Sequence, residues 1–229
     1  MSGEEKVGGQ AGAEATDTEK HIGRRTFIGL VVAGLAALFL GKEIFPHIPA
    51  WLSGSVNTGR FRINSVAAGP DFDPATWRLT VDGLVRKPLK LTFAQFSGLP
   101  QVEFTRDFDC VEGWGVKDVV WKGVTMREVL QRADIDPQAT NLVFHSSDLV
   151  YTDSLTLEEA LRPDTVLAHE MNGQPLQPGM GRPLRLVLPG NYGYKYVKWV
   201  VRVEAIAPGT DGYKGYWENY GYPVDASIR

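Results

Sequence analysis

The chain has 229 residues, which is enough for one good-sized domain and little else. Its net charge of −3, with no Lys/Arg block beyond the N-terminal region, gives no indication of nucleic-acid binding. A single cysteine, Cys110, excludes an intramolecular disulfide and any zinc or iron–sulfur site built from several thiolates.

The N-terminal region has the features of an export signal. Residues 1–23 are rich in Gly, Ala, Glu and Thr, and we expect a disordered cytoplasmic tail there. The pair Arg24-Arg25 is followed by Phe27 and an apolar run from Leu30 to Leu40. This pattern resembles a twin-arginine signal, whose export machinery carries folded proteins, and it is equally compatible with an ordinary membrane anchor that has a basic flank.

The apolar run is expected to remain as a single-pass anchor over residues 24–48. No small-x-small cleavage site follows it, and extension through Ile44 and Phe45 brings it toward the ~20 residues that a membrane span needs. The positive-inside rule leaves the residues before the run in the cytoplasm. The expected location is therefore the cytoplasmic membrane, with residues 60–229 facing the periplasm or cell exterior.

Beyond residue 60 the sequence predicts short strands. They are expected where apolar and polar residues alternate or β-branched residues dominate, at residues 77–81, 102–108, 141–144, 183–188 and 197–206. Short helices are expected over residues 94–97, 124–133 and 156–161, with Thr92, Thr125 and Thr156 as N-caps. The sum is a mixed α+β domain, mostly strands, with short helices between them.

Cys110 directly follows the expected strand 102–108, so a loop at the strand end could bring its thiol to a ligand. A lone cysteine is most often a small buried apolar residue. A thiolate needs charge compensation, which a metal ion supplies. A cysteine hydrolase would instead place His145 or His169 beside the thiol.

Several ordered segments resemble the molybdopterin enzymes of the sulfite-oxidase type. They are residues 109–114 with 120–124, 167–176, 181–190 and 192–199, supported by residues 73–79 and 215–217. The resemblance covers about residues 60–229. It implies the fold of that family's molybdopterin-binding domain, an α+β fold that is mostly β with mixed sheets and short helices.

The resemblance also implies a molybdenum–molybdopterin cofactor, with Cys110 as the metal ligand from the protein. A soft thiolate suits this ligation. Arg185 and Lys198 match the family's phosphate contacts, in keeping with the forked donors of Arg and the point charge of Lys, although two solvated strand charges are the alternative. The remaining cofactor contacts implied are Asn64, Ser65, Ser146, Tyr196 and Val197.

The pattern departs from sulfite oxidases proper at three places. Ile63 stands before Asn64, where those enzymes carry Arg, and the loop after Cys110 has no Arg. His169 replaces a tyrosine expected near the metal. Because each lost charged hydrogen bond is worth about 1.5–3 kcal/mol, sulfite is disfavoured and a neutral sulfoxide is favoured, with His169 as a catalytic proton donor or, alternatively, a supporting or solvent-facing residue.

Trp114, Trp121 and Trp217 are expected to be core or pocket wall rather than a platform for substrate.

The function predicted for the chain is oxygen-atom transfer on a small or protein-bound substrate outside the cytoplasmic membrane. The chain has no Cys-x-x-Cys-His motif and no length for a haem domain, so a separate cytochrome or membrane electron-transfer partner is expected. Sulfite dehydrogenation is the alternative within this class, and a non-catalytic binding or assembly module with the same fold is the alternative outside it.

Overall fold

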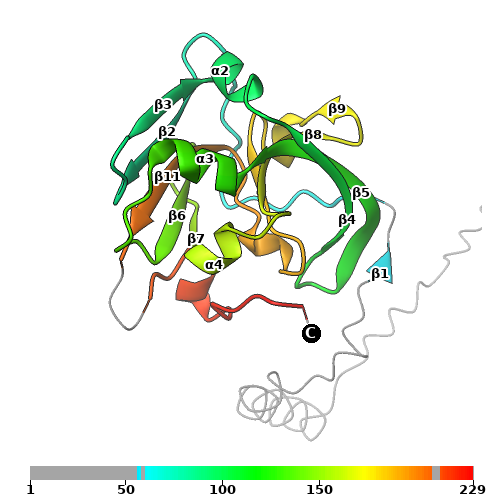
Figure 1. The fold of residues 1–229 in the computed structure, drawn as a ribbon. Helices are drawn as coiled ribbons and strands as arrows, with labels where there is room; N and C mark the ends of the chain where they lie inside the picture. The colour runs from blue at the N-terminus through cyan, green and yellow to red at the C-terminus, as the bar shows by residue number, and fades with distance from the viewer. Residues whose placement is uncertain (1–55, 58–59, 208–211, 229) are drawn as a thin grey trace, which may run out of the picture. The chain divides into compact units, whose positions relative to one another are not determined.

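Short strands in two sheets make up most of the backbone (Figure 1). The computed structural model describes residues 56–57, 60–207 and 212–228, which lie within one unit, Ala50–Arg229. The tail of residues 1–23 and the anchor of residues 24–48 lie outside the described residues. Within the described ranges, no helix is long and apolar enough to cross a membrane.

The first sheet carries the hairpin that holds Cys110. Its central path runs β1 (Val56–Asn57), β5 (Trp114–Thr125), β8 (Val166–Met171) and β10 (Arg185–Val187), while β4 (Val102–Asp109) pairs with β5 and β9 (Gln174–Pro175) pairs with β8. Only the pairing of β1 with β5 is parallel among the described strands of this sheet.

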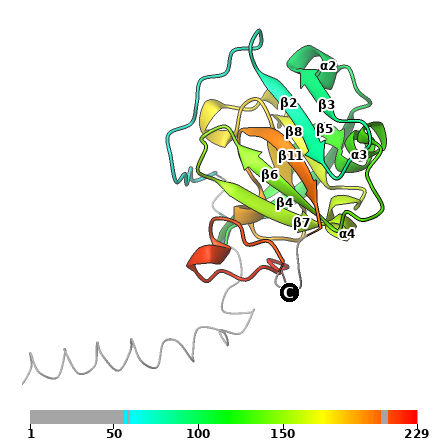
Figure 2. The same ribbon diagram turned by 90° about the vertical axis from the view of Figure 1, so that its left-hand side faces the viewer.

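The second sheet has the order β3 (Leu89–Thr92), β2 (Arg78–Gly83), β11 (Val200–Ile206), β6 (Asn141–Ser146) and β7 (Thr152–Thr156). Figure 2 shows β2, β11, β6 and β7 side by side. β2 and β11 are parallel and the other neighbours antiparallel. The expected α+β fold with mixed sheets is therefore confirmed.

The three short α-helices begin at the threonines that the sequence indicated. They are α2 (Phe93–Ser97), α3 (Met126–Ala133) and α4 (Leu157–Ala160), capped by Thr92, Thr125 and Thr156 respectively. Each threonine hydroxyl accepts a hydrogen bond from the N–H three residues on, which satisfies a donor that the first helical turn leaves free. Three 3₁₀ turns follow: η2 (Pro178–Met180), η3 (Gly193–Lys195) and η4 (Glu218–Tyr220).

Two expected strands are shorter than the sequence indicated, and several described strands, among them β5, β7 and β8, were not expected. The strand expected over residues 197–206 begins only at Val200, because Trp199 has a positive φ of 54° after the η3 turn. The strand expected over residues 183–188 is reduced to β10. No local pattern predicted β7 or β8, and β7 lacks a strand pattern because it buries two polar side chains, Asp153 and Ser154.

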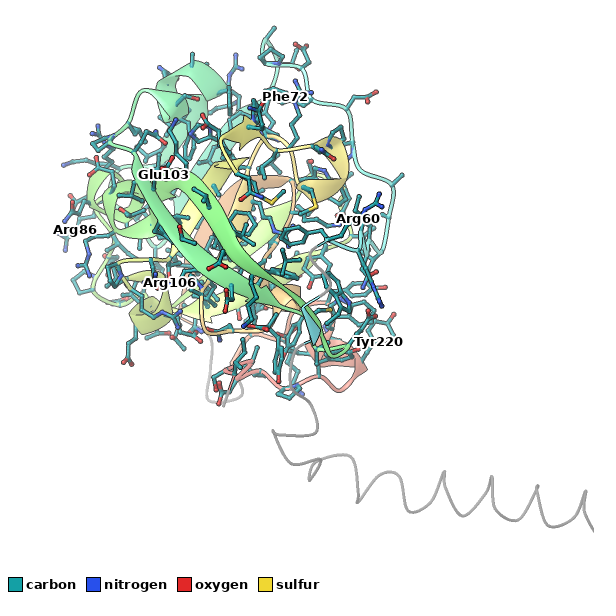
Figure 3. The ribbon with its side chains drawn as sticks, turned by 90° about the vertical axis from the view of Figure 1, so that its right-hand side faces the viewer. Arg60, Phe72, Arg86, Glu103, Arg106 and Tyr220 are labelled. Carbon is teal, nitrogen blue, oxygen red and sulfur yellow. The ribbon has the colours of Figure 1, made fainter. Side chains whose placement is uncertain are left out.

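The hydrophobic core lies between the sheets and includes side chains from both, with Trp121, Phe96 and Phe144 among the largest that are fully buried. The β4–β5 hairpin crosses the face shown in Figure 3, where Glu103 and Arg106 mark β4. Tyr220, from the C-terminal part of the chain, is labelled near the lower end of that hairpin. The hairpin thus extends from the core toward the cavity described below.

Gly123 is required where β5 meets β8. A Cβ on this residue would lie 2.1 Å from the Leu167 carbonyl oxygen and 2.6 Å from Ala168 Cα, both backbone atoms that cannot move aside cheaply. We expect Gly123→Ala to lower the free energy of unfolding by about 2–3 kcal/mol, as overpacking of a core does. Urea denaturation measures this loss.

Gly98→Ala is the matched control, because its Cβ would make ordinary contacts at 3.4 Å and its φ is −81°. It should change the free energy of unfolding by less than about 1 kcal/mol. Equal stability of the two variants would contradict the close approach of β5 and β8.

Candidate active site

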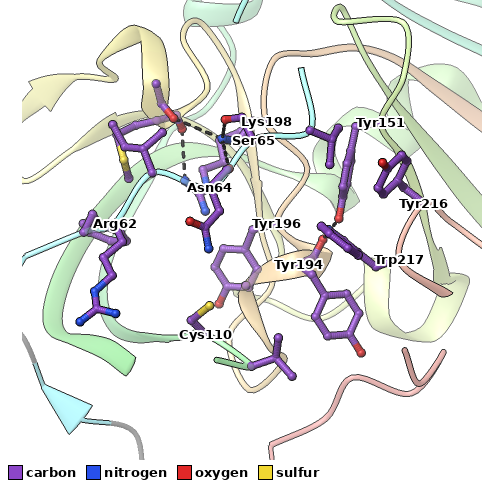
Figure 4. A pocket seen from close by; sticks show the side chains of 18 of the residues that line it. Arg62, Asn64, Ser65, Cys110, Tyr151, Tyr194, Tyr196, Lys198, Tyr216 and Trp217 are labelled. Carbon is purple, nitrogen blue, oxygen red and sulfur yellow. Dashed lines mark hydrogen bonds between the residues drawn. The ribbon is translucent and has the colours of Figure 1, made fainter. Parts of the chain in front are cut away.

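A cavity of about 580 Å³ opens beside the tip of the β4–β5 hairpin. Its walls come from residues 61–66, the hairpin tip, the loop after β6, the η2 and η3 turns with the segment that follows, and the C-terminal part of the chain. Seven of the nine predicted site residues line it: Asn64, Ser65, Cys110, Ser146, Arg185, Tyr196 and Lys198 (Figure 4). Segments far apart in sequence therefore meet in one place.

Cys110 sits in the tight turn between β4 and β5. Its N–H donates to the Trp114 carbonyl at 2.8 Å, and its carbonyl accepts from the Gly113 N–H at 3.0 Å. Gly113 closes the turn with a φ of 81°, which glycine adopts without steric cost. The thiol is held at the end of paired strands, which fixes its position more firmly than a long loop would.

The half-buried thiol of Cys110 has a raised pKa, chiefly because burial disfavours the thiolate. The Glu112 N–H opposes this rise, the Glu112 carboxylate adds to it, and Arg62 and Arg185 act against it. A thiolate at this position therefore needs a further cationic partner, and a metal ion is such a partner.

Arg185 is a buried cation without a carboxylate partner among the described residues. Its guanidinium carbon lies 5.3 Å from the ring centroid of Phe108 and 5.8 Å from those of Trp121 and Tyr196. Nη1 donates to the Met180 carbonyl at 3.3 Å, while Nε has no partner. Burial lowers the pKa of Arg185 to about 10. A buried guanidinium whose Nε makes no hydrogen bond to the described residues favours an anionic ligand in the adjoining cavity.

Lys198 provides a second cation next to Arg185, because the two residues form an antiparallel bridge. Its Nζ donates to the Asn64 carbonyl at 2.6 Å and to Ser65 Oγ at 2.5 Å. Burial and the charge of Arg185 lower the pKa of Lys198 to about 8, and Asp148 opposes this effect. Two neighbouring cations at one wall of the cavity fit a site for a phosphate group.

Glu112 joins the segment of residues 61–66 to the hairpin tip. Its Oε2 accepts from Asn64 Nδ2 at 3.0 Å and from Trp114 Nε1 at 3.1 Å. The buried Ser146 Oγ accepts from the Asp148 N–H at 3.2 Å and so shapes the loop after β6. These contacts hold polar atoms of three separate segments around one cavity.

His169 does not line the cavity, contrary to the position expected for a proton donor. It lies on β8, where Nε2 is 2.9 Å from Gln101 Oε1 and the ring packs edge-on against Phe93 and Phe96. Burial lowers its pKa. His169 thus lies on β8 outside the cavity lining, and its catalytic role stays a prediction.

Two further predicted positions also lie outside the cavity lining. Val197 is buried behind it, and its carbonyl accepts from the Leu186 N–H at 2.8 Å. His145 lies on β6 with Nε2 3.0 Å from Glu204 Oε2. Neither histidine shares the cavity with Cys110, so the arrangement expected of a cysteine hydrolase is not found among the described residues.

Arg62 and a group of aromatic residues line the cavity without having been predicted to do so. Arg62, one position before Ile63, lies 5.9 Å from the Trp114 ring centroid and is exposed in the cavity. Tyr151, Tyr194, Tyr216 and Trp217 gather on the side opposite Arg62, as Figure 4 shows. The aromatic, aperiodic stretch 213–222 was the available signal. Trp114 and Trp217 line the cavity as pocket wall, and Trp121 is core.

Comparison with known proteins finds one matching family and several similar enzymes. Residues 66–214 match the family described as oxidoreductase molybdopterin binding domain. The uncharacterized oxidoreductase YuiH of Bacillus subtilis is 34% identical over 150 residues, which cover 66% of this chain and 74% of that protein. The protein-methionine-sulfoxide reductase catalytic subunit MsrP of Gluconobacter oxydans is 28% identical over 227 residues, covering 85% of this chain and 72% of MsrP.

Other matches cover smaller parts of longer proteins. Nitrate reductase [NADH] 1 of Oryza sativa subsp. japonica is 33% identical over 199 residues, which are 72% of this chain but 22% of that enzyme. The crystal structure of the sulfane dehydrogenase SoxCD from Paracoccus pantotrophus superposes with a TM-score of 0.59 at 26% identity, covering 63% of this chain and 41% of that one.

The lowered pKa of Lys198 predicts pH-dependent anion binding by the cofactor-free protein. The ammonium form, which attracts anions, predominates below pH 8 and is lost above it. Sulfate stays a dianion throughout, so its affinity should fall about tenfold between about pH 7 and pH 9. Calorimetric titration measures this fall. Lys198→Met should bind weakly at both pH values, whereas exposed Lys90→Met should behave as the wild type; a pH-independent wild-type affinity would contradict the assignment.

Proposed function

Because the chain belongs to the oxidoreductase molybdopterin-binding domain family, we propose that this molybdenum-cofactor oxidoreductase reduces a sulfoxide to a sulfide with electrons from a separate redox partner. The observation that carries this proposal is the cavity that brings Cys110 together with Arg185 and Lys198. Its residues fit the family's cofactor: a thiol that needs a cationic partner stands at one side, and two cations that need an anion stand at another.

In this proposal Cys110 is the protein's ligand to molybdenum, and Arg185 with Lys198 binds the phosphate of the pterin. The polar groups of Asn64, Ser65, Ser146 and Tyr196 contact the remainder of the cofactor, and Val197 shapes the segment that carries Tyr196 and Lys198. When bound, the cofactor supplies a metal centre that exchanges an oxygen atom with substrate in two-electron steps.

A sulfoxide is supported by the neutral, aromatic side of the cavity. Tyrosine and tryptophan rings suit the contacts that a sulfur-bearing group makes, at about 5 Å from a ring. Exposed apolar side chains stand at the cavity or beside residues that line it: Ile63, Val111, Leu149, Val150 and Tyr220. Such a rim suits an uncharged small substrate or a sulfoxide carried on a polypeptide. The MsrP relative is named for such a reaction.

The reaction consumes one sulfoxide, two protons and two electrons, and releases one sulfide and one water. The electrons are assigned to a separate cytochrome or membrane electron-transfer protein. The name "catalytic subunit" of the MsrP relative supports a division of labour of this kind. The export signal or anchor expected from the sequence over residues 24–48 agrees with a reaction outside the cytoplasmic membrane, and we propose that the domain of residues 60–229 faces the periplasm.

Sulfite dehydrogenation remains a second candidate because of Arg62. The sequence suggested that the site lacked arginine near the metal ligand, but Arg62 lies in the cavity and favours the thiolate of Cys110. A guanidinium there could bind an oxyanion with forked hydrogen bonds.

A pair of steady-state assays separates the two candidates. With a reduced viologen as donor, methyl phenyl sulfoxide should be turned over; with ferricyanide as acceptor, sulfite should be oxidised at least about a hundredfold more slowly in kcat/KM, a difference of about 2.7 kcal/mol. Arg62→Met should change sulfoxide turnover little. Faster sulfite oxidation, abolished in Arg62→Met, would instead favour the second candidate.

Cys110→Ser tests the metal ligand. The hydroxyl is a hard, weakly acidic donor in place of a soft thiolate, so turnover should fall by at least about a hundredfold while the thermal unfolding midpoint of the cofactor-free protein stays within a few degrees. Metal analysis of protein from a molybdenum-replete host accompanies the assay. Wild-type protein without molybdenum, despite an intact pterin supply, or a fully active Ser variant would refute this role.

A further inference from the structure

The C-terminal segment, defined as residues 213–227, forms one side of the cavity. Tyr216, Trp217 and Tyr222 from this segment line the cavity together with Tyr151 and Tyr194. We propose that this segment is a substrate-facing wall of the active site, and that Lys195 is the positioning residue that holds it in place through Glu218. The identity of the substrate rests on the proposed function; the attachment of the wall does not.

Lys195 joins three segments at a fully buried point. Its Nζ donates to Asp153 Oδ1 on β7 at 2.7 Å, to Glu218 Oε1 on η4 at 2.5 Å and to the Ser154 carbonyl at 3.1 Å. An ammonium has three N–H donors, and these contacts use all of them. Lys195 and Asp153 are each 1% exposed and Glu218 is 5% exposed, so water does not compete for these bonds.

The charge of Lys195 is maintained by its partners. Burial alone would lower the pKa of Lys195, but Asp153 and Glu218 outweigh burial and raise it above its ordinary value. Asp153 Oδ2 and Glu218 Oε2 are buried without a partner among the described residues. Burial raises the pKa of Asp153 to about 8 although Lys195 opposes this rise. Taking these three ionisable groups from water is costly, and apolar packing of similar volume would avoid that cost. The arrangement therefore calls for a role beyond stability.

The role of this ionic cluster follows from the residues next to Lys195, Glu218 and Asp153 in the sequence. Lys195 lies between Tyr194 and Tyr196, Glu218 follows Trp217, and Asp153 lies two residues after Tyr151. Tyr151, Tyr194, Tyr196 and Trp217 all line the cavity. One buried ammonium thus sets the spacing between walls contributed by three parts of the chain.

Besides the bond between Lys195 and Glu218, further contacts align the C-terminal segment along β7. The Tyr216 N–H donates to the Thr152 carbonyl at 2.8 Å, and the rings of Tyr151 and Tyr216 stack with centroids 5.6 Å apart. Gly215 allows this approach, because a Cβ there would lie 2.7 Å from the Thr152 carbonyl oxygen. Tyr194 Oη donates to the Pro223 carbonyl at 2.7 Å at the far end. The wall is therefore positioned by hydrogen bonds and ring stacking at several points, in addition to the buried ion pair of Glu218 with Lys195.

Glu218→Ala is the variant that tests this proposal. It removes the charged attachment of the segment but leaves Lys195 hydrogen-bonded to Asp153, whereas Lys195→Met would leave both buried carboxyl groups without their cation and endanger folding. Hydrogen exchange should become faster at residues 213–227 and stay unchanged in β5 and β8. With the substrate that the wild-type holoenzyme turns over, KM should rise about tenfold and kcat change less than about threefold, at unchanged molybdenum content.

Two matched variants complete the test. Glu218→Gln keeps an oxygen that accepts from Lys195 and should restore wild-type KM and exchange. Glu158→Ala, the same substitution at an exposed position of α4, should have no effect. Unchanged exchange of the segment in Glu218→Ala, or equal loss of kcat and kcat/KM together with molybdenum, would overturn the proposal. A wild-type enzyme inactive on sulfoxides refutes only the proposed function, since exchange is measured without turnover and KM can be measured with sulfite.

Discussion

The architecture of the site depends on a buried guanidinium that has no carboxylate partner among the described residues. Arg185 enters the core on β10, the short strand at the end of the first sheet's path, and is surrounded by the rings of Phe108, Trp121 and Tyr196. The rings stabilise the cation through their faces but leave Nε without a hydrogen bond. A fold that keeps a charge in this position needs an anion at the adjacent opening, and the surrounding segments are arranged to form that opening.

The two sides of the cavity beside Arg185 differ in the chemistry of their side chains. The segment of residues 61–66 and Lys198 bring polar and cationic groups to one side, where they suit the anionic part of a cofactor. The other side consists of tyrosines and a tryptophan held by a buried ionic cluster, and it suits a neutral substrate. Cys110 lies at the tip of a long hairpin whose strand β5 is central in its sheet, so its sulfur is placed by rigid elements.

The sequence predicted those parts of the fold and site that local patterns determine. The N-caps Thr92, Thr125 and Thr156 were recognisable because capping depends on residues three apart. Arg62 and His169 could not be placed, because a resemblance in chain order does not tell which side chains face a cavity, and in extended chain a shift of one residue reverses the face. The cluster of Lys195, Asp153 and Glu218 was not found because its members are up to 65 residues apart in number and meet only in three dimensions.

The bridge between Arg185 and Lys198 has a thermodynamic consequence for assembly. Burial of Lys198 and its proximity to a like charge raise the free energy of the folded chain when no anion lies beside them, and burial first, then Arg185, lowers the pKa of Lys198. An anionic ligand removes this repulsion in the native state alone, so loading and folding are linked by mass action. The loaded chain is therefore expected to unfold at a higher denaturant concentration than the empty one.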